Sequence, residues 1–86
     1  MIDKLNEARE KIDLLDREIT RLYVQRLDCV ELIGQIKAQH NLPVKNEERE
    51  SAVIANVLSV TPDAKAKYVR ELFETVMKTG RAYQQK

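Results

Sequence analysis

The chain has 86 residues, enough for one small domain at most, so the predicted organisation is a single domain over residues 1–86. Its formal net charge of +1 gives no global field that favours nucleic acid or an anionic membrane. The sole cysteine, Cys29, excludes an intrachain disulfide, and the sequence lacks the apolar run of a signal peptide or membrane span. We therefore expect a soluble, cytoplasmic protein that binds neither nucleic acid nor membrane.

The first predicted element is a long helix over about residues 3–39. It contains no proline and one glycine, Gly34, and Asp3 is placed to cap its first turn. Pro43 disfavours helix in the residue before it, so we expect the helix to end near positions 40–41. Apolar residues recur along one stripe at spacings of three and four: Ala8, Ile12, Leu15, Ile19, Leu22, Cys29, Ile33 and Ile36. Arg26 is the one charged member of this stripe.

Two shorter helices are predicted after it, over about residues 47–59 and 62–85. Asn46 can cap the first of them, and Pro62 suits the first helical position of the other. The residues expected on their inner faces are Ala52, Val53, Val57 and Leu58, then Val69, Leu72, Phe73, Val76 and Met77. The chain shows no strand-like alternation, so the predicted fold class is all-α.

The length of the first helix predicts an oligomer. About 38 residues at 1.5 Å per residue make a helix of roughly 57 Å, whereas a compact chain of this size has a radius of gyration of about 12 Å. Two short helices cannot cover such a stripe from end to end. We therefore predict an intertwined homodimer in which the long helices of two chains lie side by side.

Several polar residues stand where the helical pattern calls for apolar ones. Arg26 and Lys37 share a face about 16 Å apart, so their long side chains can converge on one small anion. An unpaired buried cation is costly, so each needs a carboxylate from the protein or from a ligand. The structural alternatives are a register-setting residue for Arg26 and a favourable helix C-terminus for Lys37.

The two shorter helices add further candidates. Arg49 and Glu50 lie one turn before the inner face of the second helix, where an exposed charge pair is the alternative. Gln84 extends the apolar line of the third helix with an amide, unless the last turn frays. Gly80 in a helix interior costs about 1 kcal/mol relative to alanine, which indicates close approach of a backbone or a ligand.

Arg9 cannot serve the same site within one chain. It lies 17 residues before Arg26, about 25 Å along the helix and roughly 100° around it. In an antiparallel dimer, however, the start of one helix lies near the middle of its partner. We therefore expect Arg9 to complete the pocket of the second chain.

Together these residues resemble the all-helical chorismate mutases. The resemblance rests on Arg9-Glu10-Lys11-Ile12 with Asp16, then Arg26, Gly34, Lys37, Pro43-Val44, Arg49-Glu50 and Gln84. The family implies an intertwined dimer with two sites, each lined by three helices of one chain and capped by the other chain. The implied reaction is the Claisen rearrangement of chorismate to prephenate in aromatic amino-acid biosynthesis, without covalent intermediate, metal or cofactor. Such a step needs a compact substrate conformer and stabilisation of charge on the ether oxygen.

The resemblance also implies roles for individual residues. Arg26 and the Arg9 of the second chain would hold the substrate carboxylates, Lys37 and Gln84 would donate to the ether oxygen, Glu50 would bind the hydroxyl, and Arg49 would order the site. Three positions depart from the family pattern, because Asn46 replaces a common Asp, Gly80 a small hydroxyl residue, and Met77 a branched aliphatic. These departures bear on affinity more than on the type of reaction.

Two other functions fit part of the pattern. An isochorismate-pyruvate lyase would share the arginines, Lys37 and Gln84, but Glu50 favours the mutase, because the related lyases lack a carboxylate there. A non-catalytic helical dimerisation or regulatory module would instead pair its arginines with internal carboxylates such as Asp16, Glu18 or Glu50. Free-standing chains of this family sometimes work with a partner enzyme of the same pathway, and the sequence leaves open both such a partner and whether prephenate feeds phenylalanine, tyrosine or another product.

Overall fold

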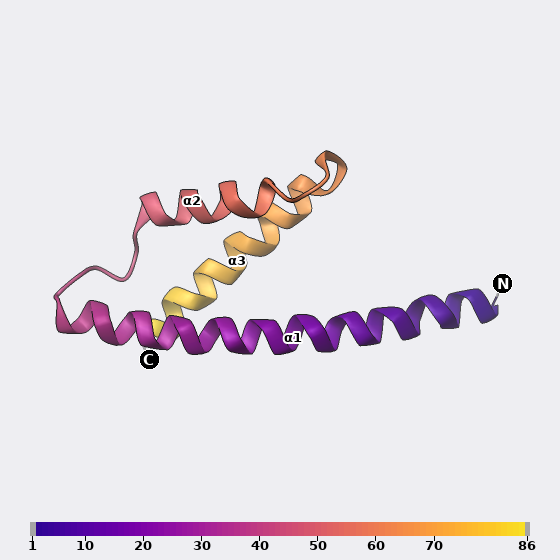
Figure 1. Cartoon of the computed structure of the whole chain (residues 1–86), viewed down its shortest axis with the longest axis horizontal. Helices are drawn as coiled ribbons and strands as arrows, with labels where there is room; N and C mark the ends of the chain where they lie inside the picture. Colours follow the sequence, from indigo (N-terminus) through magenta and orange to yellow (C-terminus); the bar gives the residue numbers. More distant parts are fainter. Residues whose placement is uncertain (1, 86) are drawn as a thin grey trace.

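The computed structural model describes residues 2–85 and is all-α, as predicted. Its elements are α1 (Ile2–Gln39), α2 (Glu47–Leu58), a short 3₁₀ turn η1 (Asp63–Lys65) and α3 (Ala66–Gln84). Figure 1 shows α2 running back along the C-terminal half of α1, with α3 crossing diagonally to meet α1. The N-terminal part of α1, coloured indigo, extends beyond the other helices (Figure 1).

The C-terminal end of α1 at Gln39 is confirmed, whereas the cap predicted at its N-terminal end is wrong. The helix is already formed at Ile2, so Asp3 lies inside its first turn and is not the N-cap. Its carboxylate still lies near the positive end of the helix dipole. At the other end, Asn41 adopts a left-handed conformation with φ 55°, and the amide of Leu42 donates to the carbonyl of Lys37 at 2.8 Å. This pattern is a Schellman cap, which stops the helix before Pro43 is reached.

The start of α2 confirms the predicted cap. Asn46 has extended backbone angles, φ −130° and ψ 101°, and its Oδ1 accepts a hydrogen bond from the amide of Arg49 at 2.9 Å. This bond satisfies one of the free amides of the first turn. It also sets the start of the helix and therefore the direction in which Arg49 and Glu50 project.

The predicted start of α3 at Pro62 is wrong. Pro62 has φ −59° but an extended ψ of 142°, because its ring restricts only φ. The amide of Lys65 then donates to the carbonyl of Pro62 at 2.9 Å, which closes a 3₁₀ turn, and the α-helix begins only at Ala66. The predicted inner face is confirmed for Val69, Phe73, Val76 and Met77, whereas Leu72 on α3 and Ala52 on α2 are exposed.

Polar contacts between distant residues join α3 to α1. The hydroxyls of Tyr23 and Thr79 share a hydrogen bond of 2.5 Å. The hydroxyl of Tyr83 donates to the carboxylate of Glu31 at 3.0 Å. Val30 and Met77 are the buried apolar side chains of the described residues, so the core is small and lies where α3 crosses α1.

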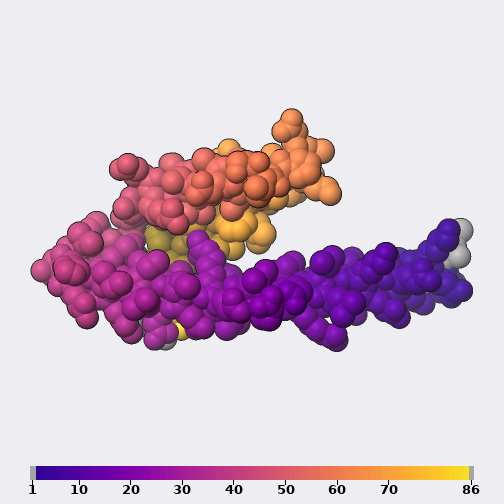
Figure 2. Space-filling view, viewed as in Figure 1, coloured from indigo at the N-terminus to yellow at the C-terminus, as the bar shows by residue number. Residues whose placement is uncertain are grey.

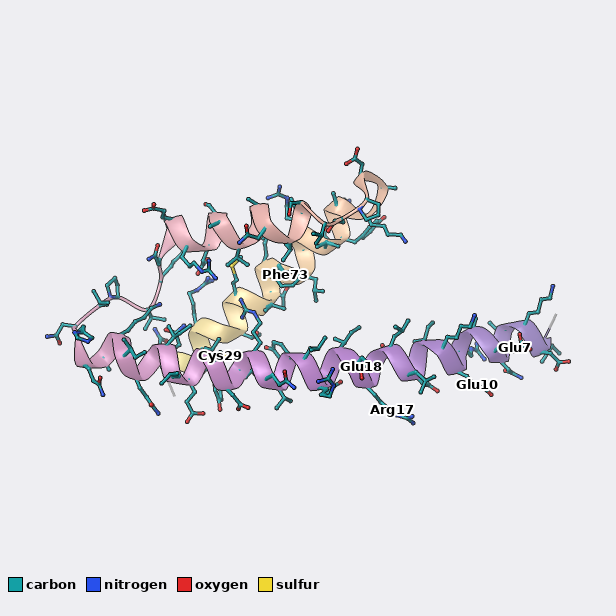
Figure 3. The ribbon with its side chains drawn as sticks, viewed as in Figure 1. Glu7, Glu10, Arg17, Glu18, Cys29 and Phe73 are labelled. Carbon is teal, nitrogen blue, oxygen red and sulfur yellow. The ribbon has the colours of Figure 1, made fainter. Side chains whose placement is uncertain are left out.

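Much of the apolar stripe of α1 is not covered by the chain itself. Ile12, Leu15 and Ile19 are each more than half exposed. The longest dimension of the molecule is 57 Å, and its radius of gyration of 16.3 Å exceeds the value of about 12 Å for a compact chain. Glu7 and Glu10 lie on the projecting part of α1 (Figure 3). No helix among residues 2–85 combines the length and the apolar character needed to cross a membrane.

Candidate active site

All three helices line one cavity of about 240 Å³. It lies between α1 and α2, where the space-filling view shows a hollow with α3 behind it (Figure 2). Seven of the eight residues singled out from the sequence line it: Arg26, Lys37, Asn46, Arg49, Glu50, Gly80 and Gln84. The eighth, Arg9, is exposed on the projecting part of α1 and does not line this cavity.

The helix α1 contributes two cations to the cavity. The side chain of Arg26 is half-buried and, among residues 2–85, makes no hydrogen bond or ion pair. Its planar guanidinium therefore keeps all of its donors for an anion. The ammonium of Lys37 donates to the carbonyl of Val44 at 2.6 Å, which ties the residue to the loop after α1. Since an ammonium has three N–H donors, two remain for a ligand.

The first turn of α2 contributes Asn46, Arg49 and Glu50. The amide oxygen of Asn46 is used as the helix cap, which leaves its NH₂ group as a donor. The carboxylate of Glu50 is bound by Arg81, whose Nη1 lies 2.5 Å from Oε2. Sequence reasoning missed Arg81, because a cation in the last turn of α3 also fits the usual preference at a helix C-terminus.

From α3, Gln84 presents an amide to the cavity. Its Oε1 is buried and, within residues 2–85, has no hydrogen-bond partner. The amide oxygen can only accept a hydrogen bond from a ligand, whereas the NH₂ group, which makes no hydrogen bond within residues 2–85, can donate to a ligand oxygen. The backbone of α3 approaches α1 closely at this point: a Cβ at Gly34 would lie 3.3 Å from the side chain of Gln84.

Of the two alternatives predicted at Gly80, close approach of a backbone is not found, and close approach of a ligand stays a prediction. A Cβ at position 80 would lie 3.7 Å from Nη1 of Arg26 and 3.8 Å from the side chain of Val30, which is ordinary van der Waals contact. The tight crossing of the two helices is at Gly34 instead. Gly80 is nevertheless buried and leaves open space beside the guanidinium of Arg26.

The charge of the cavity suits a dianion. Four cations line it, namely Arg26, Lys37, Arg49 and Arg81, against the single carboxylate of Glu50, so the described lining carries three excess positive charges. Cations on three different helices can hold two separate acidic groups of one small molecule. The apolar wall formed by Val30, Ile33 and Met77 lowers the local dielectric and strengthens these interactions.

The sequence of this chain matches a known family over nearly its whole length. The pattern described as chorismate mutase type II covers residues 8–85. The chain belongs to the chorismate mutase type II family. Six of the curated proteins match it significantly, whereas no solved structure does.

Relatives of this chorismate mutase domain include longer proteins. The chain is 42% identical to the T-protein of Haemophilus influenzae over 53 residues, 62% of this chain and 14% of that protein. It is 36% identical to the bifunctional chorismate mutase/prephenate dehydratase of Aquifex aeolicus over 62 residues, 72% of this chain and 17% of the relative. It is 38% identical to the chorismate mutase of Methanocaldococcus jannaschii over 53 residues, 62% of this chain and 54% of that protein. The matched segment thus spans about a sixth of the two longer relatives and about half of the shorter one.

Proposed function

We propose that this chain catalyses the rearrangement of chorismate to prephenate. The observation that carries the proposal is the cavity itself, in which four cations from three helices and one unpartnered amide surround a space of about 240 Å³. Chorismate is a small dianion, and its rearrangement is intramolecular. A site for it therefore needs groups that bind and orient rather than a nucleophile.

In this mechanism Arg26 binds one carboxylate of the substrate with two parallel N–H donors, which fixes orientation as well as position. As the carbon–oxygen bond breaks, negative charge develops on the ether oxygen. Lys37 and the amide of Gln84 donate to that oxygen and stabilise the charge more strongly in the transition state than in the substrate. Glu50 accepts a hydrogen bond from the ring hydroxyl.

The second carboxylate is bound by Arg9 of a second chain. The exposed apolar stripe of α1 supports this arrangement, because a second copy of α1 would cover Ile12, Leu15 and Ile19. Arg9 and Arg26 are too far apart along one helix to share a ligand. A homodimer with antiparallel α1 helices brings the Arg9 of one chain to the cavity of the other.

The two alternative functions are less well supported. In a non-catalytic module Arg26 would be paired with an internal carboxylate, but Glu18 binds Arg21 and Glu50 binds Arg81, which leaves Arg26 open. For an isochorismate-pyruvate lyase, the carboxylate of Glu50 inside the cavity is the discriminating feature. The relative from Aquifex aeolicus is named as joined to prephenate dehydratase, so an enzyme that consumes prephenate is the proposed partner of this chain.

The test is incubation of the purified chain with chorismate and no added cofactor. We expect the absorbance of chorismate to fall and prephenate to appear in the NMR spectrum. Pyruvate release, measured with a coupled assay on chorismate and isochorismate, would identify a lyase instead. If micromolar protein leaves chorismate unchanged, the proposed activity is wrong.

A further inference from the structure

Arg81 and Glu50 form an ion pair that bridges α3 and α2 at the wall of the cavity. Arg81 belongs to the last turn of α3 and Glu50 to the first turn of α2, and Nη1 lies 2.5 Å from Oε2. The two side chains are 27% and 23% exposed. A charge pair shielded to this degree is held more firmly than one on the open surface.

The cations around this pair determine where the carboxylate of Glu50 would go if Arg81 did not hold it. Glu50 is the one carboxylate that the described residues contribute to a cavity lined by Arg26, Lys37 and Arg49 as well as Arg81. A carboxylate that is free to move in such surroundings would approach the nearest unpaired cation. Arg26 and Arg49 both lack a side-chain partner among residues 2–85, but Arg26 is half-buried and Arg49 is exposed, so water would screen an ion pair with Arg26 less. That contact would place Glu50 in competition with an anionic ligand.

We infer that Arg81 is a positioning residue that holds Glu50 away from Arg26 and so keeps the anion site open. The inference rests on the proposed function, because the anion in question is a substrate carboxylate. Arg81 binds only Oε2 of Glu50, so Oε1 remains free to accept the hydrogen bond from the substrate hydroxyl. Arg81 thus acts on the substrate through Glu50.

The position of the pair fits this role. Glu50, Met77 and Arg81 line the cavity on one side and a second hollow between α2 and α3 on the other. The ion pair therefore forms part of the wall between the two spaces. Glu74 lines the second hollow too, yet the observed partner of Arg81 is Glu50, which draws the guanidinium toward the cavity.

The test begins with Arg81→Met, which keeps an unbranched apolar stem and removes the guanidinium with its charge. We expect KM for chorismate to rise about tenfold, because Glu50 is then free to occupy Arg26. Arg81→Lys should recover part of this loss, since a point charge still attracts the carboxylate but lacks the planar donors. Arg70→Met is the matched control, because Arg70 is an exposed cation of the same helix that does not line the cavity.

A double-mutant cycle with Glu50→Gln separates this role from others. If Arg81 acts through Glu50, Arg81→Met should change KM less than about twofold in the Glu50→Gln background. An equal rise in KM in both backgrounds would show that Arg81 contacts the substrate itself and would overturn the inference. An unchanged KM for Arg81→Met in the otherwise native chain would also overturn it. All of these outcomes are measured on a native protein that is active. A native protein without activity would instead contradict the proposed function, so the two failures can be told apart.

Discussion

The side chain of Gln84 on α3 packs against α1 at Gly34. A Cβ atom added to Gly34 would lie 3.3 Å from both Cβ and Cγ of Gln84. The amide of Gln84 is buried against the cavity, with its Oε1 unpartnered among the described residues. Glycine at position 34 thus sets how deeply this amide enters the site. The distance between α1 and α3 at this crossing is a determinant of the proposed chemistry.

Gly34→Ala is expected to separate stability from activity. Alanine in a helix interior gains about 1 kcal/mol over glycine, but the new methyl requires Gln84 to move by a few tenths of an ångström. We expect kcat to fall about tenfold, because a misplaced donor loses its transition-state contact, while the free energy of unfolding changes little. Steady-state kinetics and urea denaturation measure the two effects.

The control for this change is Gly80→Ala, which also replaces a glycine inside a helix. Its Cβ would make only ordinary contacts, 3.7 Å from Arg26, so the free energy of unfolding should rise by about 1 kcal/mol. Gln84 is not displaced in this variant, and the loss of kcat should be smaller. Equal losses of kcat in both variants would contradict the role assigned to Gly34.

Gln84→Glu should make the activity depend on pH, with the highest activity at low pH. A carboxyl group donates a hydrogen bond to the ether oxygen only when it is protonated, and it normally ionises near pH 4 to 5. As the pH rises, the new group loses its proton and repels the developing negative charge. The ratio kcat/KM of the variant should therefore fall between about pH 4 and pH 8, while the native amide gives no such decline. A variant with the native pH profile would exclude Gln84 as a donor.

Arg26→Ala and Lys37→Ala should each lower kcat/KM by about two orders of magnitude or more. Arg26 makes no contact with another charged group among residues 2–85, so its loss should leave helicity and oligomeric state intact. Arg17→Ala, a change at an exposed cation of the same helix, is the control (Figure 3). Circular dichroism and sedimentation check the fold. Unfolding of the Arg26→Ala chain would favour a register-setting role for this residue.

The sequence predicts the fold well where a local signal is strong. The 3.6-residue periodicity of α1 and the capping side chain of Asn46 each lead to the observed element, because both depend on neighbours in the chain. The predicted start of α3 is wrong because Pro62 restricts φ and leaves ψ open. The backbone after Pro62 is therefore free to form a 3₁₀ turn.

For the site, the sequence indicates those residues that interrupt the apolar pattern of a helix. Arg26 and Gln84 stand in apolar lines, and both line the cavity. Arg81 breaks no pattern, since a cation at a helix C-terminus is common, and only the crossing of α2 and α3 brings it to Glu50. The same limit explains Gly80 and Gly34: a glycine in a helix indicates a close approach, but the partner helix decides which glycine needs it.

The proposed contribution of Arg9 in trans can be tested by mixing two inactive variants. Arg9→Ala chains retain Arg26, and Arg26→Ala chains retain Arg9, so a hybrid dimer has one site with both arginines and one with neither. If subunits exchange at random in an equal mixture, half of the dimers are hybrids, and about a quarter of the native sites are restored. Activity should therefore recover to about a quarter of the native value, with native mass spectrometry used to verify exchange. Complete exchange without recovery would show that Arg9 and Arg26 do not act in one shared site.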